Sequence, residues 1–159
     1  MALVWFAMLG VDFLLNGAVF ARMYQDGGAF LLPPAQAAAR IPLGYLAFLL
    51  VAFGIVEVDC RLGIVGVAGG IRLGLVLGGL GGLVWALSLY SIASITAAEA
   101  GALAFVWFAA VFVGSAVAAA ARARASVRRL ALAVAGFDLG CFAIVVAAQS
   151  SGMVPTVTM

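Results

Sequence analysis

Two aspartates lie in the middle of long apolar segments, where a charged side chain is energetically expensive. Asp12 lies within MALVWFAMLGVDFLLNGAVFA and Asp138 within LALAVAGFDLGCFAIVVAAQ, and neither stretch holds another charged residue. Ionisable groups at membrane depth typically pair with one another, bind ions or relay protons. If the two segments are neighbours in the fold, their carboxylates could share a proton or bind a cation.

Neutral oxygens and amides could complete such a site. Asn16 follows Asp12 by four residues, so both side chains share one face of a helix. Tyr90 and Ser91 add hydroxyl groups in a polar stretch of a third apolar segment. The structural alternative is that each carboxyl group hydrogen-bonds separately to a neighbouring helix and sets the register of a bundle.

A second group of charges lies near the end of another apolar segment. These charges predict a cluster of ion pairs at the membrane interface. Within it, Arg72 either pairs with Glu57 or binds an anionic lipid headgroup. The four residues of this predicted cluster are Glu57, Asp59, Arg61 and Arg72.

Several chemistries are excluded because their residues are missing. The chain has no His and no Lys, so it offers no imidazole ligand, no Ser-His or Cys-His pair and no Schiff base. Its six scattered carboxylates have no metal-ligand spacing. We therefore predict no metal site, no cofactor and no enzymatic activity; a lipid-modifying enzyme using Glu57, Asp59, Glu99 or Cys60 is the least favoured alternative.

A regular glycine pattern predicts close helix packing. Small residues every four positions leave a groove along one helix face, and another backbone can approach it closely. The groove serves either packing within this chain or association between chains; a lipid tail is a third possible occupant. The glycines predicted to pack in this way are Gly66, Gly70, Gly74, Gly78 and Gly82, with a shorter pair at Gly136 and Gly140.

The composition identifies the solvent in which these residues act. The 159 residues are 67% hydrophobic and 9% charged, against about 25% charged in soluble domains. Such a chain cannot cover a globular surface with polar groups, so lipid surrounds most of it and nucleic acid is no partner. We predict an all-α integral membrane protein, a single domain over residues 1–159. Its five transmembrane helices are expected at residues 2–21, 41–58, 73–95, 102–121 and 130–149.

Arginine distribution predicts the orientation of this bundle. With five spans, six arginines flank one side and two the other. Positive residues stay in the cytoplasm, so the N-terminus is expected inside and the C-terminus outside. Four spans plus an interfacial helix before residue 41 is the alternative. The Lys-free, Ala- and Gly-rich composition suggests a bacterial inner membrane.

Three stretches carry a resemblance: VDFLLNG, ARIPLGYLAFLL and GIRLGLVLGGLGGLVWALSLYSIASI. Over about residues 1–110 the chain resembles small uncharacterised bacterial integral membrane proteins, classed as domains of unknown function with a four-helix unit. This resemblance implies a polytopic helical fold and no activity, with the span containing Asp138 as an addition.

Two functions fit these features. The first is a small transporter or channel-like module in which intramembrane carboxylates couple to protons or cations, working as a homo-oligomer. The second is a non-catalytic subunit or assembly factor of a larger membrane complex, which packs on a partner protein through its glycines. Membrane lipids are partners in either case.

Overall fold

The computed structural model describes residues 1–26, 34–93, 95–123 and 126–154, and all regular structure in this part of the chain is helical. Five apolar helical segments are long enough to cross a membrane. In chain order, the elements are α1 (Ala2–Leu14), η1 (Leu15–Val19), α2 (Ala21–Asp26), α3 (Pro34–Arg61), α4 (Val67–Ile92), α5 (Ala97–Arg122) and α6 (Val127–Ser150). The predicted all-α bundle of five membrane-spanning helices is confirmed, rather than four spans and an interfacial helix.

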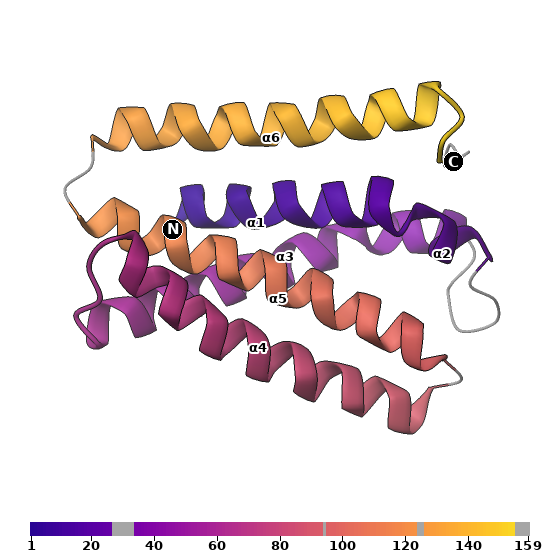
Figure 1. The fold of residues 1–159 in the computed structure, drawn as a ribbon, viewed down its shortest axis with the longest axis horizontal. Helices are drawn as coiled ribbons and strands as arrows, with labels where there is room; N and C mark the ends of the chain where they lie inside the picture. Colours follow the sequence, from indigo (N-terminus) through magenta and orange to yellow (C-terminus); the bar gives the residue numbers. More distant parts are fainter. Residues whose placement is uncertain (27–33, 94, 124–125, 155–159) are drawn as a thin grey trace.

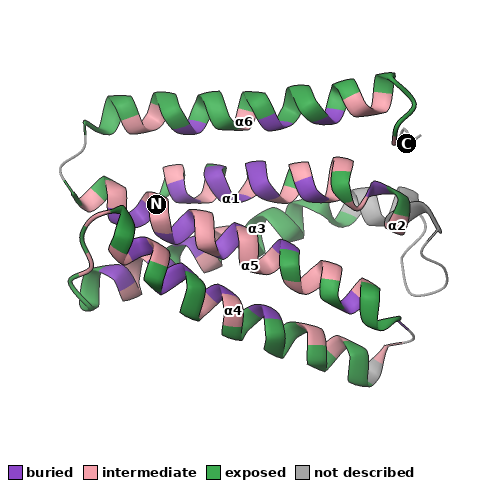
Figure 2. Cartoon of the chain, in the orientation of Figure 1, coloured by how far each residue is buried: buried purple, intermediate pink, exposed green. Residues whose placement is uncertain are grey.

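The helices alternate in direction, and α5 lies at the centre of the bundle (Figure 1). Its interface with α4 is the most extensive in the protein, and it also packs on α1 and α3. By contrast, α6 packs mainly along α1, at the opposite edge of the bundle from α4. Buried residues therefore concentrate on α1 and α5, while α6 and the C-terminal half of α4 are largely exposed (Figure 2).

This exposure is what a lipid-solvated protein requires. Large apolar side chains such as Leu50, Leu80 and Leu139 are more than 60% exposed. A single water-soluble chain rarely presents so continuous an apolar surface. A hydrocarbon solvent removes this problem, because lipid tails are as apolar as leucine.

Most predicted spans begin or end at different residues from those expected. The second helix begins at Pro34 rather than 41, so Pro42 lies inside α3 and not in its first turn. The third begins at Val67 rather than 73, which places Arg72 inside α4. Helices extend beyond the hydrocarbon-length window because backbone hydrogen bonding continues into the interface, and hydropathy alone does not detect those turns.

The ends of α5 and α6 also lie beyond the predicted spans, and side-chain caps explain where these helices begin. Thr96 accepts a hydrogen bond from the Glu99 backbone N–H at 3.2 Å, and the Glu99 carboxylate accepts from the Thr96 N–H at 2.6 Å. This reciprocal pair satisfies two donors that the first turn of α5 would leave free. Ser126 caps α6 in a similar way, by accepting from the Arg129 N–H at 3.5 Å.

The first predicted span is not one uniform helix. After Leu14 the backbone widens into the π-helical segment η1, which ends where the Phe20 N–H donates to the Leu15 carbonyl at 2.7 Å. A π-helical turn inside a longer helix is rare and often marks a functional site. Here it begins three residues after Asp12 and contains Asn16, so it shapes the backbone near one of the two intramembrane carboxylates.

Candidate functional site

The two intramembrane aspartates line the same cleft. The first and last spans, α1 and α6, run in the same direction side by side (Figure 1), and Asp12 and Asp138 both face the cleft between them. The cleft has a volume of about 680 Å³. Tyr45 from α3 also contributes to its lining. Chain topology thus brings together two carboxylates from opposite ends of the sequence.

The Asp138 side chain packs against the α1 backbone at Gly10, where no side chain intervenes. A Cβ atom at Gly10 would collide with Asp138 Oδ1 and would lie 3.2 Å from both Asp138 Cγ and Phe137 Cε1. A larger residue at position 10 would therefore force the Asp138 side chain or α6 to shift. The Asp138 Oδ1 atom is buried and has no hydrogen-bond partner among the described residues.

Asp12 has a different environment. The Asn16 side-chain amide donates to Asp12 Oδ1 at 2.8 Å, across one helical turn. The predicted pairing of these two residues on one helix face is therefore present. Since one of its oxygens accepts a hydrogen bond, Asp12 is the better satisfied of the two carboxyl groups and Asp138 the less satisfied.

The rest of the cleft is apolar and aromatic. No arginine is among the described residues that line it, so no cationic side chain of the lining balances the charge of the two carboxylates. Phe13 of α1 and Phe142 of α6 stack across it, with ring centroids 5.8 Å apart and an interplanar angle of 17°. The α6 residues that line it recur with helical spacing, so the face could have been read from the sequence once its partner helix was known. The remaining lining residues are Leu3, Phe6, Leu9, Gly10, Ala131, Val134, Ala135 and Leu139.

Tyr90 and Ser91 do not contribute to this site. Both lie near the end of α4, which packs along α5 at the opposite edge of the bundle from α6 (Figure 1). The Ser91 hydroxyl instead donates to the Ser88 carbonyl at 2.7 Å, within its own helix. The sequence does not reveal which helices are neighbours, and in the structure α5 separates α4 from α1 and α6.

Three residues of the predicted interfacial cluster take part in two separate ion pairs, one of which includes a residue outside the predicted cluster. Arg61 Nε lies 2.7 Å from Glu57 Oε1 in an exposed pair one turn apart. Asp59 points the other way, is completely buried, and faces Arg122 of α5 with an Nη1–Oδ2 distance of 3.8 Å. The Arg122 guanidinium also donates to the Asp59 backbone carbonyl. Sequence reasoning missed Arg122 because a contact between α3 and α5 has no local signature.

Arg72 joins neither pair. It is exposed on α4 and makes no ion pair with the described residues. The described residues also contain no group of three His, Cys, Asp or Glu side chains that could hold a metal ion.

Four of the predicted packing glycines press against α5. Cβ atoms at Gly74, Gly78 and Gly82 would lie 2.8–2.9 Å from backbone atoms of Phe112, Phe108 and Ala104 respectively. Gly70 meets Ser115 and Ala116 in the same way. Along this face, the glycines of α4 pack within the chain.

The other predicted glycines have no such neighbour. Gly66 precedes α4 with a positive φ of 85°, a conformation that glycine adopts without strain. Gly136 and Gly140 of α6 have no described atom within 4 Å of an added Cβ. These two residues therefore make no helix contact within the described part of the chain.

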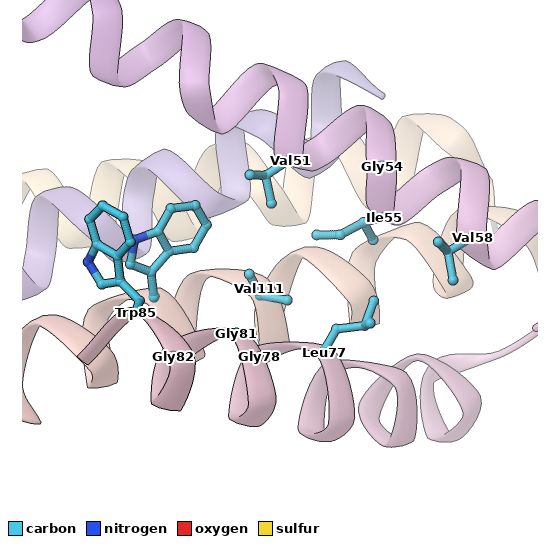
Figure 3. Close-up of a pocket in the computed structure, with 11 residues that line it drawn as sticks. Val51, Gly54, Ile55, Val58, Leu77, Gly78, Gly81, Gly82, Trp85 and Val111 are labelled. Carbon is cyan, nitrogen blue, oxygen red and sulfur yellow. The ribbon is translucent and has the colours of Figure 1, made fainter. Parts of the chain in front are cut away.

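A second groove of about 390 Å³ provides a contrast to the cleft (Figure 3). It lies between α3 and α4, with Val111 of α5 between them, and Figure 3 shows Val51, Ile55 and Val58 facing Leu77. None of the described residues that line it is charged. The α1–α6 cleft is thus the better candidate for ion chemistry.

Comparison with known proteins adds no relative to this picture. The resemblance to small bacterial membrane proteins stays a prediction. No protein family, curated protein or solved structure matches the chain significantly.

Proposed function

We propose that this protein is a small membrane transporter or channel-like module in which Asp12 and Asp138 bind protons or cations at membrane depth. One observation carries the proposal: both carboxylates line one cleft, no arginine is among the described residues that line it, and none of these residues donates a hydrogen bond to the buried Asp138 Oδ1. A site with these properties attracts positive charge, because an uncompensated carboxylate in hydrocarbon is unstable.

The chemistry follows from this instability. In a low-dielectric cleft the carboxyl groups are neutral when protonated, or are balanced by a bound cation. Proton and cation therefore compete for the same oxygens. Competition of this kind couples the movement of one species to the release of the other, which is the basis of exchange transport.

The arrangement of the helix ends supports the predicted orientation. The N-terminus and the α3–α4 and α5–α6 connections share one end of the bundle (Figure 1). Arg61, Arg122, Arg128 and Arg129 belong to this end. We propose that it faces the cytoplasm of a bacterial cell, with the C-terminus on the other side of the inner membrane. Reporter fusions to both termini test this orientation, and a cytoplasmic C-terminus would contradict it.

A reconstituted flux assay tests the function. The purified protein is placed in liposomes with a trapped pH-sensitive dye and an acidic interior, and Na⁺, K⁺ or tetraphenylphosphonium is added outside. We expect proton efflux driven by at least one of these cations. Asp138→Asn should reduce the rate at least about tenfold, since it removes the unpartnered carboxylate. Asp12→Asn should reduce it less, because Asp12 already accepts a hydrogen bond from Asn16.

Glu57→Gln is the matched control. Glu57 is also acidic, but it forms an exposed pair with Arg61 outside the cleft. Flux should be unchanged in this variant. Wild-type rates in both aspartate variants, or a wild-type rate equal to that of empty liposomes, would overturn the proposal.

The alternative function is a subunit of a larger membrane complex. The exposed glycine pair Gly136 and Gly140 on α6 favours it, since small residues on a helix face admit a partner helix. Native mass spectrometry after gentle extraction separates the two functions. A homo-oligomer supports transport, whereas a different protein bound at fixed stoichiometry supports the subunit role.

A further inference from the structure

We propose that the α1–α6 cleft takes a lipophilic organic cation, a protonated amine, quaternary ammonium or phosphonium group on an apolar body, in preference to a metal ion. This inference rests on the proposed function, because it names the class of cation that competes with protons at Asp12 and Asp138. Three properties of the cleft support it: its ligand set, its aromatic lining and its opening to the lipid.

The ligand set does not suit a divalent metal ion. Ca²⁺ takes about six to eight oxygen ligands, and Mg²⁺ keeps several bound waters, which an apolar cleft does not solvate. The cleft offers two carboxyl groups, one of which already accepts a hydrogen bond from Asn16, and the described residues include no group of three acidic or thiol side chains that could hold a metal ion. An organic cation needs no shell of oxygen ligands, because its charge is neutralised by a carboxylate while its apolar body replaces water.

The residues that line the cleft suit the apolar part of an organic cation. Around the carboxylates lie aromatic rings from three helices, Phe6 and Phe13 of α1, Tyr45 of α3 and Phe142 of α6. Aromatic faces attract alkylammonium and related cations, and this attraction grows when water is absent. The volume of about 680 Å³ also lies in the range of small-molecule sites, about 300–1,000 Å³.

The cleft opens to the membrane. Phe6, Phe13 and Phe142 line it and are still 42–55% exposed. Their exposed parts face the surroundings of the bundle, which for a membrane-spanning helix are lipid tails. A cation with an apolar body partitions into that region and can reach Asp138 laterally. A small hydrated ion has no such route, since it would first have to leave water.

Binding of tetraphenylphosphonium to the full-length purified protein in detergent tests the inference. Equilibrium dialysis with the radiolabelled cation gives the affinity. We expect saturable binding that releases protons, weakened at least about tenfold by Asp138→Asn because the counter-charge is lost. Phe142→Leu keeps an apolar side chain and removes the aromatic face, so it should weaken binding about 3- to 10-fold.

Phe53→Ala is the control for the aromatic variant. Phe53 is 58% exposed on α3 and lines neither the cleft nor the α3–α4 groove, so its removal should leave the affinity unchanged. Circular dichroism and gel filtration establish that each variant is folded. If a variant is not folded, protection of wild-type Asp138 from dicyclohexylcarbodiimide by tetraphenylphosphonium replaces it, measured by peptide mass spectrometry.

The outcomes separate this inference from the proposed function. If Na⁺ or K⁺ drives Asp138-dependent proton flux while tetraphenylphosphonium neither binds nor protects Asp138, the inference is overturned and the proposed function stands. Equal binding to wild type and Asp138→Asn shows nonspecific partition and overturns the inference as well. Absence of both flux and binding overturns both proposals.

Discussion

The α4–α5 and α1–α6 interfaces both depend on glycine, but different groups lie against the glycines. On α4, Gly74, Gly78 and Gly82 face the backbone of α5, so the two helices meet along their main chains. Gly10 of α1 and Gly17 of η1 instead face side chains of α6, namely Asp138 and Val145. The first arrangement closes the interface, whereas the second leaves space beside it for a cleft.

The glycines of the α4–α5 interface serve helix packing, whereas Gly10 in the α1–α6 interface lies at the candidate site. Four glycines at regular spacing form a close helix pair, whose energy comes from van der Waals contact that lipid cannot supply. A single glycine opposite an aspartate instead creates a seat for a carboxyl group. The longer and more regular glycine pattern therefore marks structure, and the isolated Gly10 marks the candidate site.

A large side chain at the centre of the α4–α5 interface should have the largest effect. A Cβ atom at Gly74 would lie 2.8 Å from Phe112 Cα, and backbone cannot move aside cheaply. We expect Gly74→Leu to lower the free energy of unfolding by more than about 3 kcal/mol. Detergent denaturation followed by circular dichroism measures this. Gly79→Leu is the control, since Gly79 faces open space; equal destabilisation of both variants would contradict the proposed packing.

Asp59 and Asp138, each with a buried carboxyl oxygen that accepts no hydrogen bond from a described residue, form the next comparison. Asp59 faces Arg122 and has no role in the cleft, whereas Asp138 has no cationic neighbour in it. Arg122→Gln should therefore destabilise the fold, by about 2 kcal/mol, because it leaves Asp59 buried without a counter-charge. In the double variant Asp59→Asn/Arg122→Gln, stability should partly recover. A single variant as stable as wild type would show that the pair contributes nothing.

A smaller change tests the seat of Asp138. Gly10→Ala places a methyl group against the aspartate and should cost about 1 kcal/mol, since the side chain or α6 must shift. The free energy of cation binding should change by more than the free energy of unfolding. Gly136→Ala adds the same group where no described atom lies within 4 Å. We expect this control to keep both binding and stability, and a loss of binding in it would argue against a site on the α1 side.

The smallest expected effect has the opposite sign. Asp138→Asn replaces a half-buried carboxyl group, whose Oδ1 atom is buried without a partner among the described residues, by a neutral amide, so it should leave the free energy of unfolding unchanged or raise it by up to about 1 kcal/mol. Thermal unfolding in detergent measures the shift. Strong destabilisation would instead favour the structural alternative, in which the aspartate holds α6 in register.

Much of the fold could be predicted because lipid imposes simple rules. The length of apolar segments identified all five spans, since a chain in hydrocarbon must satisfy its backbone internally. Their ends were less predictable: Pro42 suggested the first turn of a helix that in fact begins at Pro34. Capping and helix continuation depend on local hydrogen bonds, which hydropathy does not register.

The candidate site was only partly predictable. Charge at membrane depth points to Asp12 and Asp138, four-residue spacing points to Asn16, and the structure brings the two aspartates to one cleft. Tyr90 and Ser91 were associated with them by polarity alone and lie on a helix at the other edge of the bundle. Arg122 was missed as the partner of Asp59 because sixty-three residues separate them.

Composition and the regular geometry of a single helix are enough to indicate a helical membrane protein, the residues that are costly in lipid, and the faces where close helix packing is possible. The neighbours of each helix are visible only in the folded bundle, where α6 lies on α1, α5 separates α4 from both, and Asp59 and Asp138 have different neighbours. Apolar helices offer similar surfaces to one another, so the choice of neighbour depends on the detailed fit of side chains such as Asp138 against Gly10.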